Sequence, residues 1–137
     1  MLAILGIITG IVAPRYGQFL ARQRVEAAAR RIVADLSYAQ RRARHMSKSV
    51  TVRFTAAAHR YTLLNTPDPD HPSATYSVSL VAEPYDAALT SVDFGGDADL
   101  VFDGFGRPDT GGTAVVRVGT YQKSVVVNAA TGEASIP

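Results

Sequence analysis

The 137-residue sequence contains no cysteine, no tryptophan and only three histidines. The absence of cysteine excludes a disulfide framework, a thiolate metal site and a cysteine nucleophile. The spacing of His45, His59 and His71 forms no HExxH-like pair, and neither a nucleophile elbow nor a GxGxxG loop is present. The sequence therefore predicts no enzyme activity, no cofactor and no small-molecule substrate.

Acidic residues gather beside glycines late in the chain, where Asp97, Asp99 and Asp103 follow Gly95-Gly96. Carboxylates close together raise the question of a calcium loop, but the spacing is not that of an EF-hand. Loop aspartates often form Asx turns instead. The residues leave calcium binding open.

Charge is absent from the first thirteen residues, MLAILGIITGIVA. As a helix this run would reach roughly 20 Å, short of a hydrocarbon core of about 30 Å. It lacks the basic n-region and cleavage site of a secretory signal, and a buried core helix is the alternative reading. We predict a membrane or filament-core stem that either only dips into a bilayer or has lost its first turns. The stem residues are Leu2, Ile4, Leu5, Gly6, Ile7, Ile8, Gly10, Ile11, Val12 and Pro14.

An apolar stripe with alternating spacings of four and three residues continues the helix beyond the stem. We predict one helix from Met1 to about Met46, loosened at Pro14 and ended by Ser47-Lys48-Ser49. The stripe, expected to pack against a sheet, comprises Val25, Ala29, Ile32, Leu36, Ala39, Ala43 and Met46. The arginines off the stripe are expected on a solvated or intersubunit face; they are Arg22, Arg30, Arg31, Arg41, Arg42 and Arg44.

After Ser49 the apolar period changes to two, which is typical of strands. A hairpin is predicted from residues 50–55 and 61–64, followed by a proline-rich loop over 65–73. Further strands are predicted at 76–80, 92–94, 100–102, 114–118, 123–128 and near Ser135. The predicted fold is α+β, with the long N-terminal helix packed on an antiparallel β-sheet or small β-sandwich. The predicted parts are the stem (1–13), the amphipathic continuation of the helix (14–48) and a β-rich domain (49–137).

Charge is divided between these parts. Residues 15–48 carry nine Lys/Arg and two acidic residues, or +7, whereas residues 49–137 carry five basic and ten acidic residues, or −5. We expect the helix and the β-rich domain to be electrostatically complementary, within one chain or between copies.

The order of these elements resembles that of type IV pilins and type II secretion pseudopilins. LAILGIITGIVAPRY is similar to the prepilin N-terminal segment, and LSYAQRRARHMSKSVTVRF resembles the helix-to-strand passage of the GspH/FimT minor pseudopilins. VFDGFGRPDTGG and VVVNAATGEASIP resemble that group's late glycine turn and terminal hairpin.

The resemblance implies a structural minor pseudopilin of a type II secretion pseudopilus that assembles through its N-terminal helix. Its implied partners are other pseudopilins or pilins. Before assembly it would be a single-pass protein of the bacterial inner membrane, with its C-terminal domain in the periplasm. The alternative is a FimT-like minor type IV pilin involved in DNA uptake or pilus assembly.

The sequence departs from the family at the processing site, because no Gly-Phe-Thr-Leu-Ile-Glu-like stretch is present. We expect a truncated chain or an internal start, and assign no residue to processing, methylation or the family's glutamate contact. The Arg-rich flank after Ala13 would by itself be placed in the cytoplasm, whereas the resemblance places it in the periplasm, which we follow.

Two features argue against a nucleic-acid partner. First, the resemblance implies that the helix contacts other subunits in a filament, so its arginines would not be free to bind DNA. Second, the terminal hairpin, Thr131-Gly132-Glu133-Ala134, is acidic and would repel phosphate.

Overall fold

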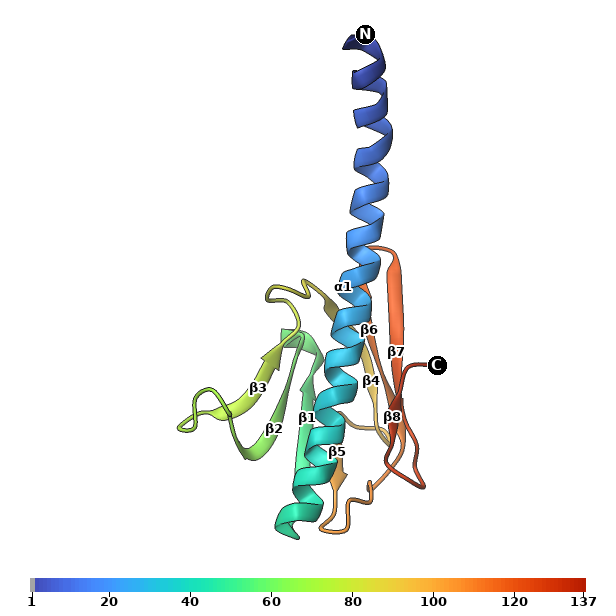
Figure 1. The fold of residues 1–137 in the computed structure, drawn as a ribbon. Helices are drawn as coiled ribbons and strands as arrows, with labels where there is room; N and C mark the ends of the chain where they lie inside the picture. Colours follow the sequence, from blue (N-terminus) through green and yellow to red (C-terminus); the bar gives the residue numbers. More distant parts are fainter. Residues whose placement is uncertain (1) are drawn as a thin grey trace.

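The computed structural model places one long helix beside two antiparallel sheets (Figure 1). It describes the backbone of residues 2–137 and the side chains of residues 17–137. Helix α1 (Leu2–Met46) is a single element that runs past the sheets at its N-terminal end. The predicted α+β fold, a long N-terminal helix on antiparallel β-structure, is confirmed.

Eight strands form two four-stranded sheets, ordered β3-β2-β1-β5 and β4-β6-β7-β8. The predicted hairpin of residues 50–55 and 61–64 is confirmed, because Val52 of β1 lies opposite Leu63 of β2. A short 3-10 helix, η1 (Ala56–Ala58), joins these two strands. The strands are β1 (Val50–Thr55), β2 (Arg60–Pro67), β3 (Thr75–Ser79), β4 (Ala88–Asp93), β5 (Asp99–Phe102), β6 (Gly112–Val118), β7 (Tyr121–Val127) and β8 (Ala134–Ser135).

Two strand boundaries differ from the prediction by three or more residues, each beside an irregularity in pairing, and the other boundaries differ by at most two residues. β2 continues to Pro67, so the predicted loop begins three residues too early; the register shifts between Leu63 and Pro67. β4 begins at Ala88 rather than residue 92, and its register shifts between Leu89 and Ser91. One extra residue lies between the paired positions of β4, and three lie between those of β2. These insertions interrupt the period of two, which is why the apolar pattern hid both ends.

The core lies between α1 and the inner faces of both sheets. Seven side chains of α1 are at most 1% exposed, and α1 contacts β1 and β5 of one sheet and β6, β7 and β8 of the other. They are Val25, Ala28, Ala29, Ile32, Leu36, Ala39 and Ala43.

Met46, assigned to the packing stripe from the sequence, is 45% exposed, so that assignment is wrong. Met46 is the last residue of α1, where the chain turns through Ser47 (φ 51°) into β1. The helical period continues to Met46, but burial of the stripe ends at Ala43.

Candidate assembly surface

The face of α1 opposite the buried stripe is open to solvent along the domain. Its exposed residues, spaced four, three, four and seven positions apart, are Gln23, Ala27, Arg30, Ala34 and Arg41, which we call the free face. Ala27 and Ala34 have short side chains, which let another helix approach closely. The stem residues assigned from the sequence, Leu2 to Pro14, continue α1, but their side chains lie outside the described residues.

A buried polar cluster fixes α1 against the β2–β3 hairpin. Asp35 is only 6% exposed and accepts hydrogen bonds from three side chains. Arg31 Nε donates to Asp35 Oδ2 (2.9 Å), Tyr76 Oη donates to Asp35 Oδ1 (2.6 Å), and the Tyr61 hydroxyl donates to Asp35 Oδ2. Arg31 also donates through Nη2 to Tyr76 (2.9 Å) and through Nη1 to Tyr85 (3.3 Å). One carboxylate thus links α1 to β2 and β3, and its Arg31 partner reaches the turn after β3.

Burial and the Asp35 carboxylate change the pKa values of the side chains that donate to it. Burial, followed by the charge of Asp35, raises the pKa of Tyr61. Burial and the hydrogen bond to Asp35 raise the pKa of Tyr76 to about 12. Burial alone would lower the pKa of Arg31, but its hydrogen bonds to Asp35 and Tyr76 outweigh that effect and raise it. At neutral pH Arg31 is therefore a cation, and Tyr61 and Tyr76 are neutral phenols.

Arg31 differs from its predicted place on a solvated or intersubunit face, because its guanidinium is bound to Asp35 and two tyrosines. The sequence contained a local sign of this: Arg31 and Asp35 are four residues apart, and Asp35 lies directly before Leu36 of the apolar stripe. The tyrosine partners had no local sign, since Tyr61 and Tyr76 come from strands far along the chain.

Two loops close over the C-terminal end of α1. Gln40 Nε2 donates to the carbonyls of Gly106 and Thr131, each at 2.8 Å, and Arg44 Nε donates to the carbonyl of Phe105 at 3.2 Å. Gly106 has a φ of +82°, and a Cβ added there would lie 2.3 Å from Arg44 Nε. The late glycine turn and the terminal hairpin, distant in sequence, therefore meet on one helix.

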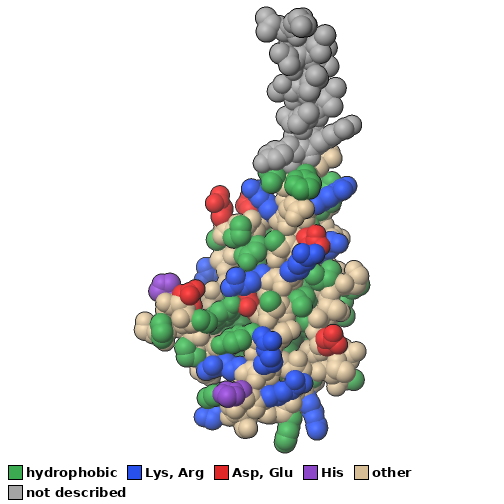
Figure 2. Space-filling view, in the orientation of Figure 1, with side chains coloured by type: hydrophobic (Ala, Val, Ile, Leu, Met, Phe, Trp, Pro, Cys, Tyr) green, Lys and Arg blue, Asp and Glu red, His purple; other side chains and the backbone are tan. Residues whose placement is uncertain are grey.

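The charge complementarity within the chain is realised at few positions. In residues 17–137, one ion pair joins α1 to the β-rich domain, between Arg24 and Asp86 (3.4 Å). Arg30 pairs with Glu26 (2.7 Å) inside the helix. Four cations near the end of α1 have no ion-pair partner among these residues; they are Arg41, Arg42, Arg44 and Lys48. Figure 2 shows Lys and Arg side chains along the whole described face, including its lower end, where α1 ends. Most of the positive charge of α1 remains available to a partner.

The family model for type II transport protein GspH matches residues 28–131. The chain belongs to the GspH family. The match begins inside α1 and includes the Asp35 cluster and both loops at the helix end. The predicted resemblance to pilin-like proteins of the GspH group is confirmed.

A solved structure, the type IV minor pilin FimU of Pseudomonas aeruginosa (strain PAO1), matches this GspH-family chain with a TM-score of 0.61. The match covers 87% of this chain and 92% of that chain at 14% sequence identity, which shows a shared fold. Comparison with curated proteins gives no match.

Several other candidate ligands of the GspH-family chain, namely Asp99, Asp103 and His59, are used within the fold. Asp99 pairs with Arg53 through two hydrogen bonds (3.1 and 3.0 Å), and Asp103 Oδ1 accepts the N–H groups of Phe105 and Arg107 (both 2.9 Å). His59 Nδ1 accepts the N–H of Leu89 (3.0 Å). Within the described part of the chain, no group of three or more metal-ligating side chains converges. Nor does any helical stretch there combine the length and apolar character that a membrane crossing requires.

Proposed function

We propose that this chain is a structural minor pseudopilin of a type II secretion pseudopilus and that it assembles through α1. Membership of the GspH family and the FimU-like fold support a minor pseudopilin or pilin role with pilin-like partners. The observation that carries the assembly route is the geometry of α1: one face is buried in the domain, and the opposite free face is exposed along it.

In this proposal the subunit acts by packing alone. The apolar stem enters a bundle of homologous stems, and the free face meets neighbouring subunits, where its arginines pair with acidic side chains. The β-rich domain faces outward, held at a fixed angle to the helix by the Asp35 cluster and by the two loops bound to Gln40. Before assembly, the stem lies in the inner membrane and the domain lies in the periplasm.

Deletion of residues 1–13 tests this proposal. The β-rich core is built by residues 25–134, so we expect the shortened protein to keep its β circular dichroism and its melting transition. Co-purification with partner pseudopilins should be lost, because the stem no longer enters the bundle. Loss of β-structure on deletion would favour the alternative that the first residues form a buried core helix, and retained co-purification would contradict assembly through the stem.

A FimT-like role in DNA uptake is the second candidate, favoured by the unpaired cations at the end of α1 and by Phe105 beside them. Phe105 is 75% exposed, and the Arg107 guanidinium carbon lies 5.3 Å from the centre of its ring. We expect the isolated β-rich domain to bind duplex DNA weakly and with no dependence on Glu133→Arg, because this domain carries −5 and repels phosphate. A gel-shift titration at low and physiological salt decides between the candidates. Salt-sensitive submicromolar binding that is lost when the arginines are removed would favour the DNA role.

A further inference from the structure

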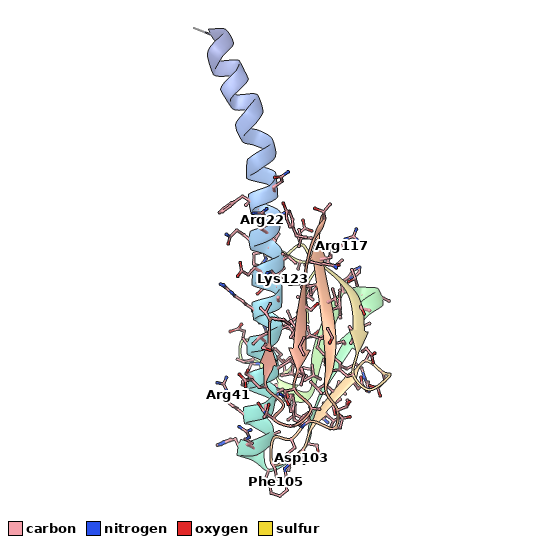
Figure 3. All side chains as sticks on the ribbon, turned by 90° about the vertical axis from the view of Figure 1, so that its right-hand side faces the viewer. Arg22, Arg41, Asp103, Phe105, Arg117 and Lys123 are labelled. Atoms are coloured by element: carbon pink, nitrogen blue, oxygen red, sulfur yellow. The ribbon has the colours of Figure 1, made fainter. Side chains whose placement is uncertain are left out.

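Basic and aromatic side chains gather at the end of the β-rich domain nearest the N-terminal part of α1. Figure 3 labels Arg22, Arg117 and Lys123 at this end, whereas Arg41, Asp103 and Phe105 lie at the opposite end. The Arg22 guanidinium carbon lies 5.1 Å from the centre of the Tyr121 ring. This cation–π contact joins α1 to the first residue of β7. We call Phe19, Arg22, Arg117, Tyr121 and Lys123 the stem-proximal patch. Tyr121 and Lys123 lie on the face of the sheet that meets α1, and Arg117 lies on the opposite face at the same end.

The cations of this patch lack acidic partners. Arg22, Arg117 and Lys123 form no ion pair among residues 17–137, and residues 1–16 contain no Asp or Glu. Two carboxylates at this end are engaged, because Glu26 pairs with Arg30 and Asp86 pairs with Arg24. Glu83, in the turn that leads to Asp86, forms no ion pair among residues 17–137. The patch therefore presents three cations that form no ion pair, against one unpaired carboxylate in the neighbouring turn.

The stem-proximal patch also contains two aromatic side chains beside its cations. Phe19 is 57% exposed on α1, and Tyr121 is half-buried under Arg22. Aromatic rings combined with Lys and Arg are the side chains that favour the headgroup region of a bilayer. A purely electrostatic protein interface would not need an exposed phenylalanine.

The distance of the patch from the stem along α1 indicates lipid headgroups as its partner. Arg22 lies nine residues after Ala13, about 14 Å along a helix. Headgroups extend roughly 5–8 Å beyond the hydrocarbon core, and the Debye length at physiological ionic strength is about 8 Å. A domain whose stem is in a bilayer therefore brings Arg22 within about one Debye length of the lipid phosphates. Tyr121, which contacts Arg22, places the start of β7 at the same level.

We propose that the stem-proximal patch rests on anionic phospholipid headgroups while the subunit waits in the membrane. The inference depends on the membrane stage of the proposed function and adds a docked orientation of the domain. Each Lys or Arg near an anionic surface strengthens binding roughly fivefold, so three cations favour the docked over the undocked domain on the order of 100-fold at low salt. Assembly into a filament then has to release this contact.

The full chain reconstituted in vesicles tests the inference, and the lack of native cysteine permits a single label. A donor fluorophore is attached to Thr120→Cys in the β6–β7 turn, with Ala130→Cys in the terminal hairpin as the comparison position. Energy transfer to an acceptor on lipid headgroups is measured in phosphatidylcholine vesicles with and without phosphatidylglycerol.

We expect phosphatidylglycerol to raise transfer from position 120 more than from position 130, and concentrated salt to reverse the rise. Arg22→Gln/Arg117→Gln/Lys123→Gln should reduce the docked-to-undocked ratio on the order of 100-fold. The matched control Arg41→Gln/Arg42→Gln/Lys48→Gln removes the same charge at the distal end and should keep the effect. Equal transfer with and without phosphatidylglycerol, or an equal loss in the control, would overturn the inference while leaving the stem as an anchor. Failure of the full chain to float with neutral vesicles would overturn the membrane stage of the proposed function, and the inference with it.

Discussion

Asp35 occupies a position in α1 where an apolar residue would fit the surrounding packing, between Ile32 and Leu36. Its carboxylate is buried and accepts hydrogen bonds from Arg31, Tyr61 and Tyr76. Removing one partner from such a group leaves the others buried and unsatisfied, which costs more than the loss of an exposed pair. The cluster therefore fixes the angle between helix and hairpin through a few specific atoms.

Asp35→Ala should lower the free energy of unfolding by about 3 kcal/mol, because two tyrosine hydroxyls and the Arg31 guanidinium lose their shared acceptor. Urea denaturation followed by circular dichroism measures this loss. Glu26→Ala is the matched control: it removes an exposed carboxylate that also pairs with an arginine four residues away, and should cost less than about 1 kcal/mol. Similar losses in the two variants would show that burial adds nothing to the Asp35 cluster.

Tyr76 makes stability depend on pH in the alkaline range. Its pKa is raised from 10.0 to about 12 in the folded state. Between these values the folded protein retains a proton that the unfolded chain has lost, so stability falls as pH rises through the interval. Tyr76→Phe removes this group and should show a shallower decline of the urea midpoint with pH. An unchanged slope in Tyr76→Phe would contradict a raised pKa at this residue.

At the scale of elements, α1 is stabilised by an apolar stripe that meets both sheets. Ile32 and Leu36 are at most 1% exposed, and the stripe is followed by solvent-exposed Met46. Apolar residues at the same helical spacing are therefore buried up to Ala43 and exposed at Met46. The spacing alone does not show which of them are buried.

Leu36→Asp should destabilise the domain by several kcal/mol, because an unpaired charge would replace a core side chain. Met46→Asp is the matched control, and thermal melting should change little because Met46 already contacts solvent. Wild-type melting of Leu36→Asp would show that this face of α1 does not cover the sheets.

Periodicity predicted the helix and the sheet content because both patterns are local. It could not predict the extra residues of β2 and β4, where shifts in the pairing register break the period of two. Nor could it find the Asp35 cluster, since Tyr61 and Tyr76 lie 26 and 41 residues away. Gln40 was equally hidden, because its two carbonyl partners come from loops that only the folded sheets bring together.

At the scale of the whole molecule, the helix carries more positive charge than the domain neutralises. In the described residues one ion pair connects α1 to the β-rich domain, and Arg41 on the free face has no ion-pair partner. In the proposed assembly through α1, these unpaired cations would be free to meet acidic side chains of neighbouring subunits.

Charge reversal on the free face tests the central claim most directly. Arg30→Glu/Arg41→Glu changes two exposed helix side chains outside the Asp35 cluster, so the fold should be kept, as checked by thermal melting. The matched control Arg60→Glu/Arg107→Glu makes the same charge change on exposed residues of the β-rich domain. The measurement is co-purification of each variant with partner pseudopilins. We predict that the free-face variant loses its partners and the control keeps them. Retained co-purification of the free-face variant, or an equal loss in both, would contradict assembly through α1.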